Sequence, residues 1–441
     1  MIGRPLLGAG LPAWLDYLEQ LDPNRIELGL ERTRSVLETL DLARPPFRVF
    51  SIGGTNGKGS VAAYLAALLR ALGPGPVGLY TSPHLLDYRE RIVVGESPVE
   101  AAALVSAFET VERARGATPL TYFEFGTIAA LEVFRRAGVR EAVLEVGLGG
   151  RLDAVNALDS AAAAVVSVSL DHQQWLGNDR DSIGREKAGI FRADRAAIIG
   201  DRDPPRGLIE TAQATGADVW LIGRDFDVET ATDGWTYRGR EQVLGPLPEP
   251  GIPGAHQRDN AAVALALLEV VEPHALEQVQ PLGVALAAVR LGGRLECRYD
   301  EQGLEWVLDV AHNPAAAATL AEWLKHAPKR PTRAVFGMLG DKDAGAVAAV
   351  MSPCIDAWYL AGLTGHRGQS AAELAARTTE AIFKPILWDN IAEAIAAAAR
   401  DARPGERIVV FGSFHTLAQA FASGLVPQSS TGSQESSCES A

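Results

Sequence analysis

The segment Gly53-Gly-Thr-Asn-Gly-Lys-Gly-Ser60 combines glycines, a lysine and a hydroxyl in the pattern of a phosphate-binding loop. Glycines let the backbone curl so that its N–H groups point at phosphate oxygens, and Lys58 can offset the charge of the β- and γ-phosphates. The segment lies between an expected strand (48–52) and an expected helix (60–72), which is the context such a loop requires. The alternative is a glycine-rich turn that binds nothing. We predict phosphate binding at Asn56, Gly57, Lys58, Gly59 and Ser60.

Polar side chains follow several of the expected strands. Ser82 follows a strand that ends at Tyr80, Glu145 ends another strand, and His172 follows the next apolar run. Ligands of open parallel sheets gather at the carboxyl ends of strands, so these groups can converge on Mg²⁺ bound to nucleotide phosphates. Each residue alone is better explained by ordinary loop polarity. Together, beside the phosphate loop, they predict a metal site.

The phosphate loop departs from the usual pattern at one position. Gly59 stands where a serine or threonine normally follows the lysine, and the hydroxyl comes one residue later, at Ser60. This change leaves phosphate binding intact but leaves direct Mg²⁺ ligation by Ser60 open.

The elements that position these residues are those of an α/β protein. Short apolar, β-branched runs alternate with amphipathic or alanine-rich segments, which is typical of a mainly parallel sheet covered on both faces. A second α/β series starts near Arg294, after a glycine-rich break that we interpret as a hinge. Strands are expected at 77–80, 141–146, 164–169, 305–310, 333–336, 355–360 and 407–411, helices at 99–112 and 126–136, and an antiparallel meander at 225–245.

Composition limits the possible functions. A chain of 441 residues is too long for one ordinary core, which predicts two domains. The formal net charge of −14 argues against a nucleic-acid partner, since such affinity depends on clustered Lys and Arg. The chain lacks a signal-peptide-like start and an apolar stretch long enough for a bilayer, and its three cysteines exclude a cysteine zinc site. We expect a cytoplasmic monomer with small-molecule substrates and no membrane partner.

The loop sequence GTNGKGS resembles that of the folylpolyglutamate synthase/dihydrofolate synthase family, relatives of the Mur ligases of cell-wall synthesis. Other segments match the family in the same order, across nearly the whole folded chain. They are 26–31, 81–85, 90–92, 122–125, 145–154, 171–172, 175–177, 182–190, 309–314 and 412–414.

The resemblance implies a P-loop-containing, Mur-ligase-like central domain with a mainly parallel sheet and a smaller, Rossmann-like C-terminal α/β domain. We place an ATP-binding domain with folate-site segments at 1–292, a glutamate-ligase domain at 293–427 and a disordered tail at 428–441. The ligand set implied is ATP as co-substrate and Mg²⁺, with two ions expected.

The resemblance also implies residue roles. The metal ligands would be Ser82, Glu145 and His172. Asn260, Arg294 and Asp309 would contact ATP, although Asn260 serves equally well as a plain helix cap. Lys187 reads from the sequence alone as a solvated helix lysine, but the family position carries an N6-carboxylysine, which forms only from the neutral amine. The catalytic residues would be Lys58, Lys187 and His172. The implied dihydropteroate site comprises Ile26, Glu27, Leu28, Gly29, Thr121, Tyr122, Phe123, Glu124, Leu152, Asp153 and Ala154.

We therefore expect an ADP-forming amide ligase. It would add L-glutamate to 7,8-dihydropteroate and further γ-linked glutamates to tetrahydrofolates through an acyl phosphate. One alternative is a folylpolyglutamate synthase alone, and a weaker one within the same chemistry is a Mur-type or cyanophycin-type ligase. An alternative of another class is a P-loop nucleotide switch or ATPase without ligase activity, which would leave Glu145, His172 and Asp309 at strand ends unexplained.

Overall fold

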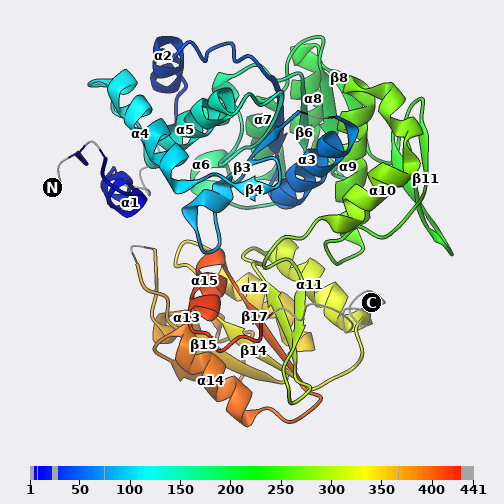
Figure 1. Cartoon of the computed structure of the whole chain (residues 1–441). Coiled ribbons are helices and arrows are strands. Elements are labelled where there is room, and N and C mark those ends of the chain that lie inside the picture. The colour runs from blue at the N-terminus through cyan, green and yellow to red at the C-terminus, as the bar shows by residue number, and fades with distance from the viewer. Residues whose placement is uncertain (1–3, 7, 22–27, 74, 366, 429–441) are drawn as a thin grey trace. The chain divides into compact units, whose positions relative to one another are not determined.

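The computed structural model describes residues 4–6, 8–21, 28–73, 75–365 and 367–428. The chain divides into two compact units (Figure 1). Unit 1 contains the described residues up to Gly251 together with Arg258–Val289, and unit 2 contains Ile252–Gln257 and the described residues from Arg290 onward. Of the tail expected to be disordered, residues 429–441 lie outside the described residues.

The described residues of unit 1 form an eight-stranded sheet in the order β4-β3-β2-β5-β1-β6-β7-β8. The strands from β2 to β8 in this order run parallel, and β3 and β4 are antiparallel at one edge. The parallel strands are continuous buried apolar runs, as expected for a sheet covered on both faces. The strands are β1 (Arg48–Gly53), β2 (Val77–Tyr80), β3 (Ile92–Val94), β4 (Ser97–Pro98), β5 (Glu141–Glu145), β6 (Ala162–Val165), β7 (Ala196–Ile199) and β8 (Asp218–Leu221).

Helices cover both faces of this sheet, with α3 on one side and α7 and α8 on the other (Figure 1). Side chains of α1, α4, α5, α7 and α8 share one apolar core with alternate residues of the strands. The helices of unit 1 are α1 (Leu11–Gln20), α2 (Glu31–Thr39), α3 (Lys58–Leu72), α4 (Ala101–Arg115), α5 (Tyr122–Arg136), α6 (Gln173–Leu176), α7 (Arg180–Ala188), α8 (Arg206–Thr215) and α10 (Val279–Ala288); α9 (His256–Val271) belongs to unit 1 from Arg258 onward.

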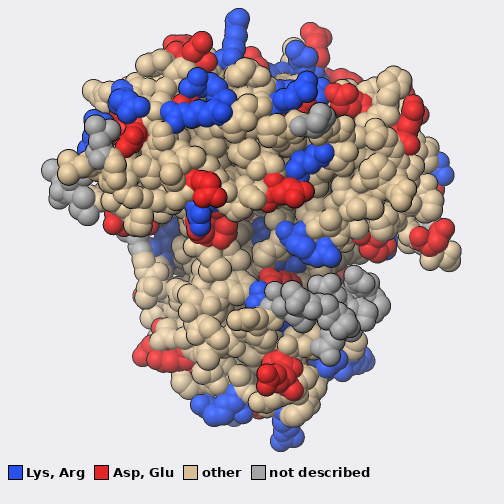
Figure 2. All heavy atoms as spheres, viewed as in Figure 1, with Lys and Arg blue, Asp and Glu red and all other residues tan. Residues whose placement is uncertain are grey.

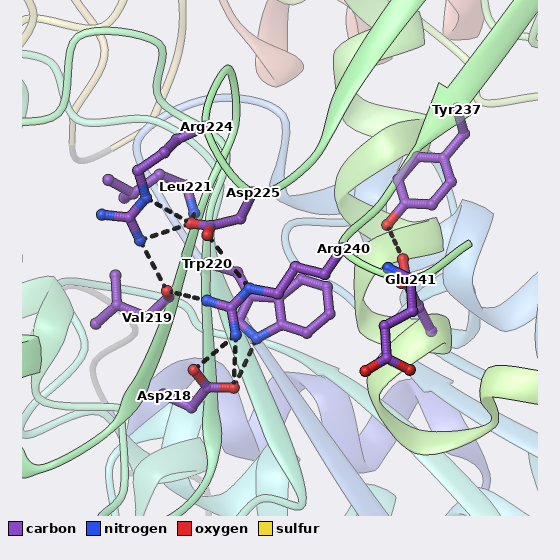
Figure 3. A network of polar contacts seen from close by, with 10 residues as sticks. Asp218, Val219, Trp220, Leu221, Arg224, Asp225, Tyr237, Arg240 and Glu241 are labelled. Carbon is purple, nitrogen blue, oxygen red and sulfur yellow. Dashed lines mark hydrogen bonds and ion pairs between the residues drawn. The ribbon is translucent and has the colours of Figure 1, made fainter. Parts of the chain in front are cut away.

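The meander expected at 225–245 is present as the antiparallel sheet of β9 (Asp227–Ala231), β10 (Gly234–Arg238) and β11 (Val243–Leu247). Arg240, in the turn between β10 and β11, attaches this sheet to edge strand β8. Figure 3 shows its guanidinium over the Trp220 ring, 4.2 Å from the centroid, and directed at the carboxylates of Asp218 and Asp225. A second attachment joins Tyr237 to α9, where its hydroxyl donates to Glu269 Oε2 at 2.6 Å.

The described part of unit 2 contains a six-stranded sheet in the order β12-β13-β17-β14-β15-β16, in which only β12 is antiparallel. Its helices enclose a separate apolar core. The strands are β12 (Glu296–Tyr299), β13 (Glu305–Asp309), β14 (Thr332–Phe336), β15 (Ala357–Ala361), β16 (Ile386–Trp388) and β17 (Arg407–Phe411); the helices are α11 (Pro314–His326), α12 (Ala344–Met351), α13 (Ala371–Thr378), α14 (Ile391–Asp401) and α15 (Phe414–Ala422).

The predicted fold class is confirmed, and one predicted strand is wrong in its extent. The expected strand at 164–169 is observed as β6 (Ala162–Val165). The regular ladder ends at Val165. Val166 N–H and Ser167 C=O still bond to Gly53 and Thr55, but both backbone groups of Val168 are bonded to side chains, its N–H to Asp201 and its C=O to Arg180. These side-chain bonds replace strand pairing.

Acidic and basic side chains are interspersed on the face of the molecule that Figure 2 draws. In the described part of the chain, the helices are too short or too polar to cross a lipid bilayer.

Candidate active site

The phosphate loop lies where the sequence predicts it, between β1 and α3. Gly57 caps the helix with φ of 82°, and Gly54 has φ of 145°, so both adopt backbone conformations that favour glycine. The loop is bonded to the segment after β6, since Thr55 N donates to Ser167 O at 2.7 Å and Asn56 N donates to Ser167 Oγ at 3.0 Å. The turn is therefore held open at a helix N-terminus, the geometry that receives phosphate.

Two of the three predicted metal ligands meet beside this loop. Ser82 N donates to Glu145 Oε2 at 3.0 Å, and that oxygen lies 3.6 Å from the position a Cβ on Gly59 would take. Glu145 is 5% exposed, so its carboxylate is held among protein groups at the carboxyl end of β5. A buried carboxylate beside a phosphate loop suits Mg²⁺, which prefers oxygen ligands and phosphate partners.

His172 comes from a neighbouring segment of the same sheet edge. It has φ of 51°, precedes α6, and its backbone N–H donates to Asp171 Oδ1 at 2.8 Å. Ser169, three residues earlier, exchanges hydrogen bonds with Thr55 through both its backbone groups. Among the residues described, His, Cys, Asp and Glu do not form a metal cluster of three or more by themselves. Mg²⁺ binding by the predicted ligands Glu145 and His172 would therefore also need the Ser82 hydroxyl and phosphate oxygens as ligands.

Lys187 is buried, which contradicts its interpretation from the sequence as a solvated lysine. Its side chain extends from α7 to the phosphate loop, where Nζ donates to Gly54 O at 2.9 Å. Gly150 permits the approach of α7, since a Cβ there would lie 2.8 Å from Lys187 O. Burial, followed by the positive charge of Lys58, lowers the pKa of Lys187 to about 7. The neutral amine needed for carboxylation is therefore accessible near neutral pH.

The described segments of the predicted dihydropteroate site lie next to one another. Thr121 and Glu124 form a capping box at the start of α5, and Glu124 also pairs with Arg32 of α2 at 3.0 Å. The Phe123 ring lies against Gly147, where a Cβ would come within 2.5 Å of it. Tyr122, Leu28, Gly29, Leu152 and Ala154 belong to these same segments, whereas Ile26 and Glu27 lie outside the described residues.

Asp153 is the predicted pterin partner and is already bonded on both oxygens. Leu148 N donates to Oδ2 at 2.9 Å and Val155 N donates to Oδ1 at 3.0 Å. Burial raises the pKa of this carboxyl to about 6, against the lowering effect of those backbone donors. A carboxyl with this pKa is mainly ionised at neutral pH, where it accepts hydrogen bonds, and it becomes a donor once it is protonated at lower pH.

The predicted ATP-binding residues are divided between the units. Asn260, on α9 in unit 1, lies against the phosphate loop, with Oδ1 2.9 Å from the position a Cβ on Gly57 would take. In unit 2, Asp309 ends β13 and accepts from Leu295 N and Ala311 N at 2.8 and 2.7 Å. Burial raises the pKa of Asp309, and Arg294, which lowers it, stacks on the Phe414 ring at 4.9 Å.

Two family models and several known proteins match most of this chain. Residues 52–268 match the Mur ligase middle domain and residues 293–414 match the Mur ligase, glutamate ligase domain. The dihydrofolate synthase/folylpolyglutamate synthase of Escherichia coli K12 is 40% identical over 415 residues, covering 94% of this chain and 95% of that protein. The chain belongs to the dihydrofolate synthase/folylpolyglutamate synthase family.

Solved structures of this family superimpose on nearly the whole chain. E. coli FolC in complex with DHPP and ADP gives a TM-score of 0.87 at 39% identity, covering 95% of this chain and 98% of that one. The bifunctional folylpolyglutamate synthase/dihydrofolate synthase with Mn, AMPPNP and L-glutamate bound also gives 0.87, at 40% identity, covering 96% and 100%. The first of these relatives binds DHPP and ADP, and the second binds Mn, AMPPNP and L-glutamate.

The sequence alone offered no reason to assign a role to Arg91. This residue contacts Tyr122, which belongs to the predicted dihydropteroate site. Arg91 packs between the rings of Tyr88 and Tyr122, at 5.2 and 5.5 Å from their centroids, and its Nε donates to His84 Nδ1 at 2.8 Å. The signal for this contact was present in the matching segments 81–85 and 90–92, whose spacing places an imidazole and a guanidinium on one loop.

Proposed function

We propose that this chain catalyses the ATP- and Mg²⁺-dependent addition of L-glutamate to 7,8-dihydropteroate, and of further γ-linked glutamates to tetrahydrofolates. The observation that carries the proposal is the meeting of the phosphate loop, the Ser82–Glu145 contact and buried Lys187 at one sheet edge. This arrangement occurs in a chain whose full-length relatives in E. coli and Haemophilus influenzae bear the name dihydrofolate synthase/folylpolyglutamate synthase.

Amide formation from a carboxylate in water requires an activated acyl group. A carboxylate oxygen of the pteroate or folate attacks the γ-phosphorus of ATP, ADP leaves, and an acyl phosphate forms. The amine of glutamate then attacks the acyl carbon, inorganic phosphate leaves, and the nitrogen loses a proton. Both reactants are anionic, so the barrier is mainly one of charge and alignment, which Lys58 and the loop amides reduce.

The metal would be held by Glu145, Ser82 and His172 together with phosphate oxygens. When bound, it neutralises charge on the phosphoryl group being transferred. We assign Lys187 to the same site in its N6-carboxy form, which forms from the neutral amine. Electron density for the carboxylate on Lys187 in a crystal grown with Mg²⁺ is the expected result, and an unmodified amine there contradicts this assignment.

The test is ADP release by the purified chain with ATP, Mg²⁺ and glutamate, using dihydropteroate and tetrahydrofolate in turn. Release that requires glutamate and occurs with either acceptor is expected, and Lys58→Met should reduce it about 10²- to 10³-fold, since a preorganised charge is lost. Turnover indifferent to glutamate and acceptor would instead support a nucleotide switch without ligase activity.

A second candidate is a folylpolyglutamate synthase alone, because such an enzyme from Lacticaseibacillus casei is 32% identical over 400 residues. Complementation of a strain lacking dihydrofolate synthase separates the two functions. Growth supports the bifunctional enzyme, and its absence together with tetrahydrofolate-dependent ADP release supports the single activity.

We also propose that the enzyme acts as a cytoplasmic monomer with domains at 1–292 and 293–427. Light scattering should give a mass near 46.8 kDa, whereas a multiple of that mass would contradict the monomer.

A further inference from the structure

The loop that follows β7, residues 200–203, lies at the carboxyl edge of the sheet and supplies none of the predicted ligands. We call Gly200-Asp201-Arg202-Asp203 the β7 loop. Its three charged side chains make contacts with three different elements of the predicted site. The loop therefore joins elements that carry ligands.

Asp201 and Arg180 hold the backbone of one residue, Val168, from both sides. Val168 N–H donates to Asp201 Oδ2 at 2.7 Å, and Val168 C=O accepts from Arg180 Nε at 2.9 Å. The two side chains face each other, with Arg180 Nη2 3.4 Å from Asp201 Oδ2. Val168 is 1% exposed, so water does not replace these partners when one is removed, and a buried unpaired amide is unfavourable.

Val168, held in this way, lies inside the segment that carries His172. On one side of Val168, Ser167 bonds Asn56 of the phosphate loop through Oγ, which accepts from its N–H and donates to its C=O. On the other side, Ser169 is bonded to Thr55. The position of the 166–172 segment thus depends on the β7 loop on one side and on the phosphate loop on the other.

The other two charged side chains of the β7 loop contact α9 and α7, which carry further predicted site residues. Arg202 pairs with both carboxylate oxygens of Asp259, at 2.7 Å each, and Asp259 is the residue before Asn260 on α9. Asp203 pairs with Arg180 at 2.8 Å, at the start of the helix that carries Lys187. Gly200 lets α9 approach, because a Cβ there would lie 2.5 Å from Val263 Cγ2.

We propose that the β7 loop, principally Asp201 with Arg180, is a positioning element that sets the 166–172 segment against the phosphate loop and so fixes His172 for the Mg²⁺–nucleotide complex. Asp201 and Arg180 touch no substrate in this role. They act through the backbone of Val168.

The test compares Asp201→Leu, which removes the acceptor for Val168 N–H, with Asp201→Asn, which keeps an acceptor oxygen. The matched control is Asp159→Leu, an exposed aspartate at the amino end of β6 that pairs with Arg192. Hydrogen–deuterium exchange of the free protein, followed by mass spectrometry, measures the protection of 166–172. Exchange there should accelerate at least tenfold in Asp201→Leu, stay near the wild type in Asp201→Asn and in the control, and remain unchanged in β17 of unit 2.

The second readout is equilibrium binding of Mg·AMPPNP, with kcat and KM for ATP measured alongside. We expect Asp201→Leu to weaken Mg·AMPPNP binding and to lower kcat by about 10²-fold, because a displacement of about 1 Å at a reacting centre has effects of this size. Asp201→Asn should restore most of both.

Unchanged exchange of 166–172 in Asp201→Leu overturns the proposal, as does accelerated exchange throughout the chain, which indicates a general loss of stability. Only the measurements of kcat and KM rest on the proposed function, because they require ligase activity. Exchange and AMPPNP binding need no turnover, so a chain that adds no glutamate refutes the proposed function while these two measurements still decide the role of Asp201.

Discussion

Lys187 is buried against the phosphate loop, where its amine donates to Gly54 O at 2.9 Å. Its helix was predicted, and α7 (Arg180–Ala188) is observed, but the lysine was interpreted as solvated because local sequence gives no signal of burial. Its burial depends on Gly54 and Gly150, which are distant in sequence and provide an acceptor and space for the helix backbone. By contrast, the positions of Ser82 and Glu145 at strand ends follow from the strands themselves.

The buried amine of Lys187 predicts a pH-dependent stability. The folded protein has this pKa near 7 and the unfolded chain near 10.5, so between these values the unfolded state binds more protons. Stability from this group is therefore lowest below pH 7 and rises toward pH 10, by up to about 1.4 kcal/mol per pH unit and roughly 5 kcal/mol in all. Lys187→Met lacks this dependence.

Urea unfolding of the wild type and of Lys187→Met from pH 6 to 10, without Mg²⁺ and in carbonate-free buffer, measures the effect. The wild type should gain stability relative to the variant as the pH rises. Lys325→Met, on an exposed part of α11, controls for the loss of one positive charge. A difference between wild type and Lys187→Met that does not change with pH contradicts a buried neutral lysine.

At the scale of elements, the sequence predicted the strands that consist of continuous apolar runs. The strands observed as β1, β2, β5 and β17 were expected within one residue, because each is a short apolar run bounded by polar or glycine residues. The short strands β3, β4 and β16, which lie at or next to the edge of a sheet, contain two or three residues and give no such pattern. The predicted strand at 164–169 was too long because Asp201 and Arg180, far along the chain, take the backbone groups of Val168.

The attachment of the meander to β8 predicts a large effect from one surface arginine. Arg240 pairs with Asp218 and Asp225, donates to Val219 O at 2.6 Å and stacks on Trp220. Arg240→Ala should lower the free energy of unfolding by about 1–3 kcal/mol, since a network and a cation–π contact are lost together. The free energy of unfolding of Arg240→Lys should lie between those of the wild type and Arg240→Ala, because lysine keeps the charge but lacks the planar guanidinium.

The matched control is Arg238→Ala on β10, whose side chain is 51% exposed and pairs with exposed Glu229. Loss of an exposed pair should leave the free energy of unfolding close to that of the wild type. Urea unfolding measures all three variants. Equal effects of Arg240→Ala and Arg238→Ala would show that the contacts of Arg240 do not stabilise the meander.

At the scale of the whole molecule, the predicted ATP-binding residues are divided between two units that each have a core of their own. Sequence patterns predicted the change from one α/β series to the next near Arg294. They could not predict that Ile252–Gln257, including the first two residues of α9, groups with unit 2, because this depends on contacts such as that of Gly254 with Leu295.

This division predicts how the nucleotide stabilises the protein. A ligand at 100 times its Kd that binds only the folded state adds about 2.7 kcal/mol. Mg·AMPPNP should therefore raise the Tm, and EDTA should remove most of the shift, since the nucleotide charge is then no longer offset by metal. Arg294→Ala, in unit 2, should reduce the shift at fixed ligand concentration. Arg400→Ala, also in unit 2 and 67% exposed, should leave the shift intact. A full shift in Arg294→Ala would remove Arg294 from the ATP site.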